Sequence, residues 1–168
     1  MSSASSKPGL PEREVIAVAC DHAGHGLKRE VLKLLAELKV PYTDLGCANP
    51  DESVHYPLYG KKVVEALLAR PQGRGILICG TGLGMSIMAN RFPGIRAALC
   101  HDIYTAMMSR RHNNSNLLVM GGRVIGPDLG KEIVRSWLTT PFEGGRHQER
   151  LDLLEQLART ASPAGAGG

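Results

Sequence analysis

Residues 75–90 read GILICGTGLGMSIMAN, and this stretch decides the fold. The apolar run 75–79 predicts a buried strand, the glycines at 80, 82 and 84 predict a loop, and residues 84–92 have helical spacing. A glycine loop that leads into a helix is typical of a turn that holds phosphate on backbone N–H groups. Cys79 stands where the strand meets this loop.

The same alternation of strand and helix signals runs through the rest of the chain. Further strands are predicted at 14–21, 42–46, 95–100 and 116–122, and further helices at 27–39, 57–70, 102–113, 127–140 and 147–160. Five such strands predict an α/β fold, with a doubly wound parallel five-stranded sheet, helices on both faces and a C-terminal helix. We expect one domain over 14–160, a disordered extension over 1–13 and a flexible tail over 161–168.

The composition narrows the class of protein. The chain has 168 residues, 43% of them apolar, which suits one ordinary globular domain. Its net charge of +4 is dispersed, and aromatic residues make up 4%, which argues against stacking platforms for single-stranded nucleic acid. No apolar run predicts a membrane span or signal peptide, and the four cysteines lack zinc-module spacing. We therefore expect reduced thiols and a cytoplasmic location.

Chemically useful side chains follow the predicted strands. In doubly wound sheets, ligands bind beyond the carboxyl ends of the strands, near the switch point. The segments that follow strands here are CDHAGHG (20–26), CGTGLG (79–84), CHD (100–102) and GGRVIG (121–126). Simpler roles remain open: Asp21 can cap the next helix, Cys79 can be a small buried apolar residue, and Asn113 and Asn114 can end a helix in a left-handed turn.

Three interpretations of the glycine loop compete. A Walker loop needs Gly-Lys-Ser/Thr at its end, but Met85 follows Gly84. A dinucleotide fingerprint has a different glycine spacing and belongs after the first strand, and a methyltransferase-type loop is misplaced in the same way. A cradle for an anion or oxyanion beside a reactive thiol is the third interpretation, and it uses Cys79.

The segment FEGGRHQER (142–150) favours a bound anion. It places Arg146 and Arg150 four residues apart at the start of the last predicted helix. Positive charges there oppose the helix dipole by roughly 0.3–1 kcal/mol each, which makes sense if they bind phosphate. A solvated arginine face, partnered by Glu149 or Asp152, is the simpler alternative.

Together, CDHAG, ILICGTGLGMSIMANRFPGIRAALC, SRRHNNSNLLVMGGRVIG and FEGGRHQER resemble the type B ribose-5-phosphate isomerases, over about residues 14–158. The resemblance implies a Rossmann-like fold and a homodimer with active sites at the subunit interface, or a dimer of such dimers. It implies interconversion of ribose 5-phosphate and ribulose 5-phosphate through an enediolate, with no metal and no cofactor. Relatives act on allose 6-phosphate, galactose 6-phosphate or tetrulose phosphates, so these substrates remain alternatives.

The resemblance also implies roles for individual residues. It makes Cys79 the base and Thr81 a proton relay, and it gives ring opening to His112 and Asp21. The substrate-binding residues that it implies are His22, Tyr56, Gly80, Gly82, Gly84, Asn113, Arg123, Arg146 and Arg150.

The chain departs from the family pattern at His55, since the family usually has an acid before the Tyr-Pro pair. This departure bears on sugar preference. Some relatives use a nearby glutamate as base, but Ser86 stands in the corresponding turn here, which favours the thiol. The expected partner is a small sugar phosphate, with no nucleic acid and no membrane. A module that binds a nucleotide or sugar phosphate without catalysis is the alternative outside enzymes.

Overall fold

The computed structural model describes residues 14–70 and 72–160, so the extensions predicted at 1–13 and 161–168 lie outside the described residues. Five strands form one parallel sheet in the order β2-β1-β3-β5-β4. Their bounds are β1 (Ile16–Cys20), β2 (Tyr42–Asp44), β3 (Gly75–Cys79), β4 (Ala97–Leu99) and β5 (Leu117–Gly121). The predicted fold class is confirmed.

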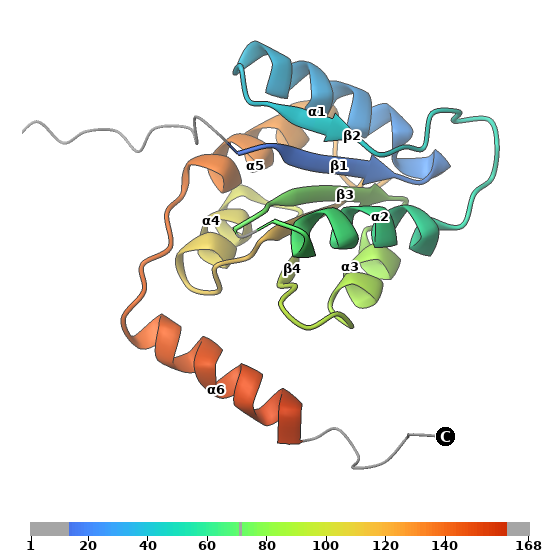
Figure 1. Ribbon diagram of the computed structural model, residues 1–168. Helices are drawn as coiled ribbons and strands as arrows, with labels where there is room; N and C mark the ends of the chain where they lie inside the picture. Colours follow the sequence, from blue (N-terminus) through green and yellow to red (C-terminus); the bar gives the residue numbers. More distant parts are fainter. Residues whose placement is uncertain (1–13, 71, 161–168) are drawn as a thin grey trace, which may run out of the picture.

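Helices cover both faces of this sheet (Figure 1). They are α1 (His25–Glu37), α2 (Tyr56–Leu68), α3 (Leu83–Ala89), α4 (Ile103–Arg111), α5 (Pro127–Thr139) and α6 (Arg146–Thr160). The sequence pattern does not predict the 3-10 turn η1 (His22–Gly24), which Asp21 caps by accepting the Gly24 N–H at 3.0 Å. Because η1 leads directly into α1, that helix begins two residues before the predicted position.

The three central strands are buried along their whole length, which explains their unbroken apolar sequences. Alternate residues of each strand face opposite layers of helices. One layer packs α1, α4 and α5 against Val18, Ile78 and Met120. The other packs α2 and α3 against Ala19, Leu77 and Cys79. Each face of the sheet therefore has its own apolar core.

The strand order creates a switch point between β1 and β3, because the chain leaves β1 toward β2 and leaves β3 toward β5 and β4. The register brings the strand ends together. Cys20 is the partner of Ile78, and Cys79 is the partner of Gly121. The loops after β1, β3 and β5 therefore meet at the carboxyl edge of the sheet.

The end of α4 lies at the opposite, amino edge. The helix starts after Asp102, runs back along the sheet, and is followed by β5, whose first residue Leu117 is the partner of Gly75 at the start of β3. In Figure 1 the strands point to the right, whereas α6 starts at the left and projects from the body that the sheet and its two helix layers form. None of the described helices has the length and apolar character needed to cross a membrane.

Candidate active site

The loop after β3 wraps around the sulfur of Cys79. The side chain is only 5% exposed, and its Sγ accepts the backbone N–H of Gly82 at 3.2 Å. Gly82 has φ +79°, and a Cβ at this position would lie 3.0 Å from the backbone carbon of Met120. Glycine is therefore required for the loop to turn and to direct its N–H at the sulfur.

The first turn of α3 forms a wall of the site together with Tyr56. A Cβ on Gly84 would lie 2.6 Å from the Tyr56 ring, so the missing side chain lets the ring lie directly on the helix. Thr81 is exposed in the same loop, and its Oγ1 accepts the Leu83 N–H at 3.3 Å. An aromatic wall and a hydroxyl therefore flank the buried sulfur.

Arg123 brings a positive charge to this loop from the end of β5. Its backbone N–H donates to the Gly80 carbonyl at 2.9 Å, and the Gly122 N–H donates to the Cys79 carbonyl at 2.8 Å. The guanidinium lies beside Gly80, since a Cβ added to that glycine would be 3.7 Å from Nη1 of Arg123. The arrangement places a cation beside the glycine loop, which suits an anionic ligand.

Asp21 and His22 complete the carboxyl edge from the end of β1. Asp21 is 7% exposed, and its backbone N–H donates to the Ile78 carbonyl at 3.2 Å. The structure confirms its capping role, because its side chain caps η1. Nδ1 of His22 accepts the Val54 N–H at 3.2 Å, which leaves the proton of the neutral ring on Nε2 and ties the loop before Tyr56 to this edge.

A second group of predicted residues lies where α4 ends and α6 begins. The rings of His112 and His147 are stacked, with centroids 4.2 Å apart and planes 9° from parallel. His147 is buried, and its Nε2 lies 3.6 Å from Oε2 of Glu143. Burial lowers the pKa of His147, and the nearby positive charges, including those of Arg146 and Arg150, lower it further, so this ring is neutral at pH 7.

Neither His147 nor Glu143 is among the site residues predicted from the sequence. Both belong to the segment FEGGRHQER, in which His147 follows Arg146 directly and stands four residues after Glu143. That i,i+4 spacing puts the two side chains near each other at the start of α6, and the contact could have been predicted from it.

The structure thus divides the predicted site residues between two places. The carboxyl edge holds Asp21, His22, Tyr56, Cys79, Gly80, Thr81, Gly82, Gly84 and Arg123. The end of α4 and the start of α6 hold His112, Asn113, Arg146 and Arg150. The four residue steps of β3 alone separate the two edges by roughly 13 Å, so one chain does not bring the two groups together.

Cys79 differs from the other three cysteines in its surroundings. All four are free thiols. Burial raises the pKa of Cys20 to about 12 and also raises the pKa of Cys100, so both stay protonated at neutral pH. The Cys47 thiol donates to the Asn49 carbonyl at 3.2 Å. The Cys79 sulfur lies in the glycine loop after β3, where it accepts the Gly82 N–H.

One set of side chains in the described part of the chain has metal-ligand chemistry. Potential ligand atoms of His112, Glu143 and His147 lie within 4.8 Å of one another. The two imidazole rings are nearly parallel. The lone pairs of their nitrogens lie in the ring planes, so they do not point at one common metal position. This geometry fits a stacked pair better than a chelate. That the reaction needs no metal stays a prediction.

A family model, related sequences and a solved structure all match this chain, and all of them are named as isomerases. The model of the ribose/galactose isomerase family matches residues 16–154. Ribose-5-phosphate isomerase B of Escherichia coli (strain K12) is 46% identical over 142 residues, which are 84% of this chain and 95% of that protein. D-erythrulose-4-phosphate isomerase of Pectobacterium atrosepticum is 42% identical over 139 residues, 83% of this chain and 91% of that protein. The structure of Clostridium thermocellum ribose-5-phosphate isomerase B matches with a TM-score of 0.83 and 45% identity, covering 88% of this chain and 99% of that one.

Proposed function

The chain belongs to the ribose/galactose isomerase family and is an isomerase, and from this premise we propose that it interconverts ribose 5-phosphate and ribulose 5-phosphate. The observation that carries the proposal is the buried sulfur of Cys79, which accepts the Gly82 N–H inside a glycine loop that lies beside Arg123. An aldose–ketose isomerisation needs a base, stabilisation of an oxyanion and a phosphate anchor, and this edge of the sheet supplies all three.

In the proposed mechanism, Cys79 as thiolate removes the proton from C2 of the open-chain aldose. The C–H electron pair forms the C1–C2 double bond of an enediolate, and the negative charge moves to the O1 atom. The backbone N–H groups around Gly82 stabilise that charge, and the Thr81 hydroxyl relays a proton between the two substrate oxygens. Cys79 then returns its proton to C1, which yields the ketose.

Ring opening and phosphate binding use the remaining residues. His112 and Asp21 transfer protons at the ring oxygen and the anomeric hydroxyl. Arg123 and His22 hold the phosphate group together with Arg146 and Arg150, and Tyr56 and Asn113 contact the sugar. Arginine suits this task because its planar guanidinium pairs two N–H groups with two phosphate oxygens.

We propose further that the active protein is a homodimer, or a dimer of such dimers, with each site shared between two chains. Two observations support this assembly. The predicted site residues lie at opposite edges of one chain, so a second chain must supply His112 and its neighbours. Large apolar side chains are also more than half exposed on α3, α4 and α6, namely Leu83, Ile87, Tyr104, Leu153, Leu154 and Leu157. An exposed apolar surface of this kind is typical of an interface.

The substrate is tested by a coupled assay on ribose 5-phosphate, run beside allose 6-phosphate, galactose 6-phosphate and erythrulose 4-phosphate. We expect the highest kcat/KM for ribose 5-phosphate. A higher kcat/KM for another sugar phosphate would keep the chemistry and change the substrate. In that case His55, exposed directly before Tyr56, is the first residue to exchange for an acid.

A further inference from the structure

A cavity of about 970 Å³ opens at the amino edge of the sheet, at the other end of β3 from Cys79. None of the residues predicted for catalysis or substrate binding lines it. Its wall includes the start of the described chain, the residues directly before β3 and β4, and the segments after α4 and α5. Six of the lining residues are Glu14, Arg74, Arg96, Arg110, Asn116 and Pro141.

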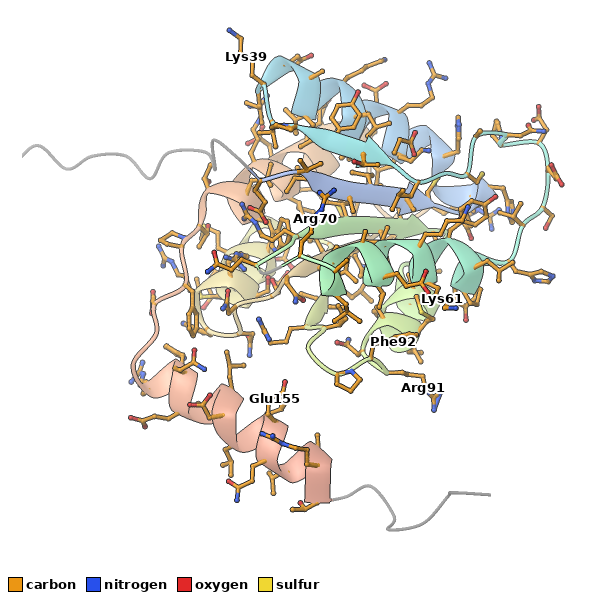
Figure 2. The ribbon with its side chains drawn as sticks, in the orientation of Figure 1. Lys39, Lys61, Arg70, Arg91, Phe92 and Glu155 are labelled. Carbon is orange, nitrogen blue, oxygen red and sulfur yellow. The ribbon has the colours of Figure 1, made fainter. Side chains whose placement is uncertain are left out.

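The cavity wall carries an excess of positive charge. Its ionisable lining residues are four arginines and one glutamate: Arg70, Arg74, Arg96, Arg110 and Glu14. A second carboxylate, that of Glu155, attracts Arg96 from α6. Figure 2 shows the Glu155 side chain directed from α6 toward the body and the Arg70 side chain near the start of the central strands. Counting both carboxylates, the excess is 4 − 2 = 2 positive charges.

Three of these arginines are held in place by shared partners. The guanidinium carbons of Arg74 and Arg110 lie 5.2 and 5.7 Å from the centroid of the Trp137 ring. Nη1 of Arg110 donates to Oδ1 of Asn114 at 3.0 Å, and Nε of Arg96 donates to the carbonyl of that same asparagine at 3.0 Å. The like charges are therefore fixed close together before any ligand binds.

Fixing like charges in a partly buried place is costly unless a counterion is present. Glu14 accepts from Nε of Arg74 at 2.8 Å and from its Nη2 at 2.7 Å, so this carboxylate neutralises one arginine. Nε of Arg110 is buried and has no hydrogen-bond partner. Burial lowers the pKa of Arg110 to about 10, and the charge of Arg74 contributes to this. The charge of Glu14 offsets part of this lowering, but no carboxylate of the described residues is bonded to Nε of Arg110.

We propose that this cavity binds a small polyanion, a molecule with two or more phosphate or carboxylate groups, through Arg96 and Arg110. The volume falls in the usual range of small-molecule sites, roughly 300–1,000 Å³. Arg74 keeps its pair with Glu14 and is left out of the proposed contacts. Arg110 stands two residues before His112, so the bound anion lies next to the turn that carries a predicted catalytic residue.

The test uses pyrophosphate and isothermal titration calorimetry at fixed ionic strength. The full-length chain carries Arg123→Gln and Arg150→Gln, so that two arginines of the proposed substrate site no longer compete for the probe. In this background we expect Arg96→Gln to weaken pyrophosphate binding about tenfold or more, since it removes one charged donor. We expect Glu14→Gln to tighten binding about threefold or more, since it removes the neutralising carboxylate.

The exposed pair Arg135 and Glu132 on α5 provides matched controls. Arg135→Gln and Glu132→Gln make the same charge changes outside the cavity and should leave the dissociation constant unchanged. Absence of pyrophosphate binding in the background protein would overturn the proposal. Shifts of equal size in the cavity variants and the controls would also overturn it. Where Arg96→Gln does not fold, the opposite sign expected for Glu14→Gln still decides.

Discussion

At the scale of single residues, the surroundings of Cys79 distinguish it from three chemically identical side chains. Burial raises the pKa of Cys20 and Cys100 and keeps both protonated, whereas the Cys79 sulfur lies in the glycine loop and accepts the Gly82 N–H at 3.2 Å. The sequence places Cys20, Cys79 and Cys100 each at a strand end, so strand position alone could not separate them. The glycine loop separates them, and the sequence did show that loop.

Replacing Cys79 tests whether its thiol is the base. We expect Cys79→Ala to lower kcat about 10²–10⁴-fold, the usual contribution of general acid–base catalysis, with little change in substrate affinity. Steady-state kinetics and a direct binding titration measure the two quantities separately. Cys100→Ala removes a buried thiol at the end of β4, which β5 separates from β3, and this variant should keep its kcat. A Cys79→Ala variant with more than a tenth of the wild-type kcat would exclude the thiol as base.

The buried ring of His147 predicts a pH dependence of stability. Its pKa is lowered in the folded chain, so the unfolded chain binds more protons as the pH falls below about 6.5. The stabilisation is therefore present above pH 6.5 and is lost as the pH falls through the folded pKa. We expect the urea concentration at half-unfolding to be lower at pH 5 than at pH 7.5 in the wild type. The decrease should be smaller in His147→Phe. Parallel pH profiles of the two proteins would contradict this assignment.

At the scale of elements, the apolar runs and glycines predicted the sheet well. β3 has the predicted bounds, and β1 and β5 differ by one or two residues at each end, because fully buried strands leave an unbroken apolar sequence. The turn η1 was not predicted, since three residues leave no periodic pattern. The sequence does not decide whether Asp21 is a cap or a ligand, because a carboxylate after a strand can serve either purpose equally well.

The position of His112 shows what the sequence pattern left undetermined. The resemblance gives His112 and Asp21 the same step of one reaction, yet the nine residues of α4 carry His112 back to the amino edge. Likewise, residues 142–150 showed an arginine pair, but the stacking of His147 on His112 depends on how α6 meets α4 in space. The residue types of the site can therefore be predicted from the sequence. Their positions depend on the direction in which each helix and strand runs.

The glycine loop makes a prediction about one element. We expect Gly82→Ala to lower the free energy of unfolding by about 1–3 kcal/mol, because alanine is strained at φ +79° and its Cβ would meet the Met120 backbone. It should also lower kcat by moving the N–H that faces the Cys79 sulfur. Urea unfolding and steady-state kinetics measure the two effects.

Gly26→Ala is the matched control for this substitution. Gly26 lies in α1, and a Cβ there would have no atom within 4 Å. We expect this variant to gain about 0.5–1 kcal/mol of stability, as glycine-to-alanine changes inside helices usually do, with kcat unchanged. Equal behaviour of the two variants would show that the loop tolerates a side chain.

At the scale of the whole molecule, the strand order separates the two halves of the proposed site. β1, β3 and β5 bring the thiol, the glycine loop and Arg123 to one edge, while α4 and α6 hold His112, Arg146 and Arg150 near the other. The helix α6 also projects from the body with exposed leucines (Figure 1). Both features have one explanation if two chains pair so that each completes the carboxyl edge of the other.

Mixing two inactive variants tests this pairing directly. If Cys79 and His112 act in one site across the interface, a dimer of Cys79→Ala with His112→Gln contains one fully native site and one doubly altered site. Random reassembly makes half of the dimers mixed, so the mixture should recover about a quarter of wild-type activity. The two variants are unfolded together in urea, refolded and assayed, and each variant refolded alone provides the baseline. If both residues acted within one chain, no site in any dimer would hold both, and the mixture would stay at the baseline.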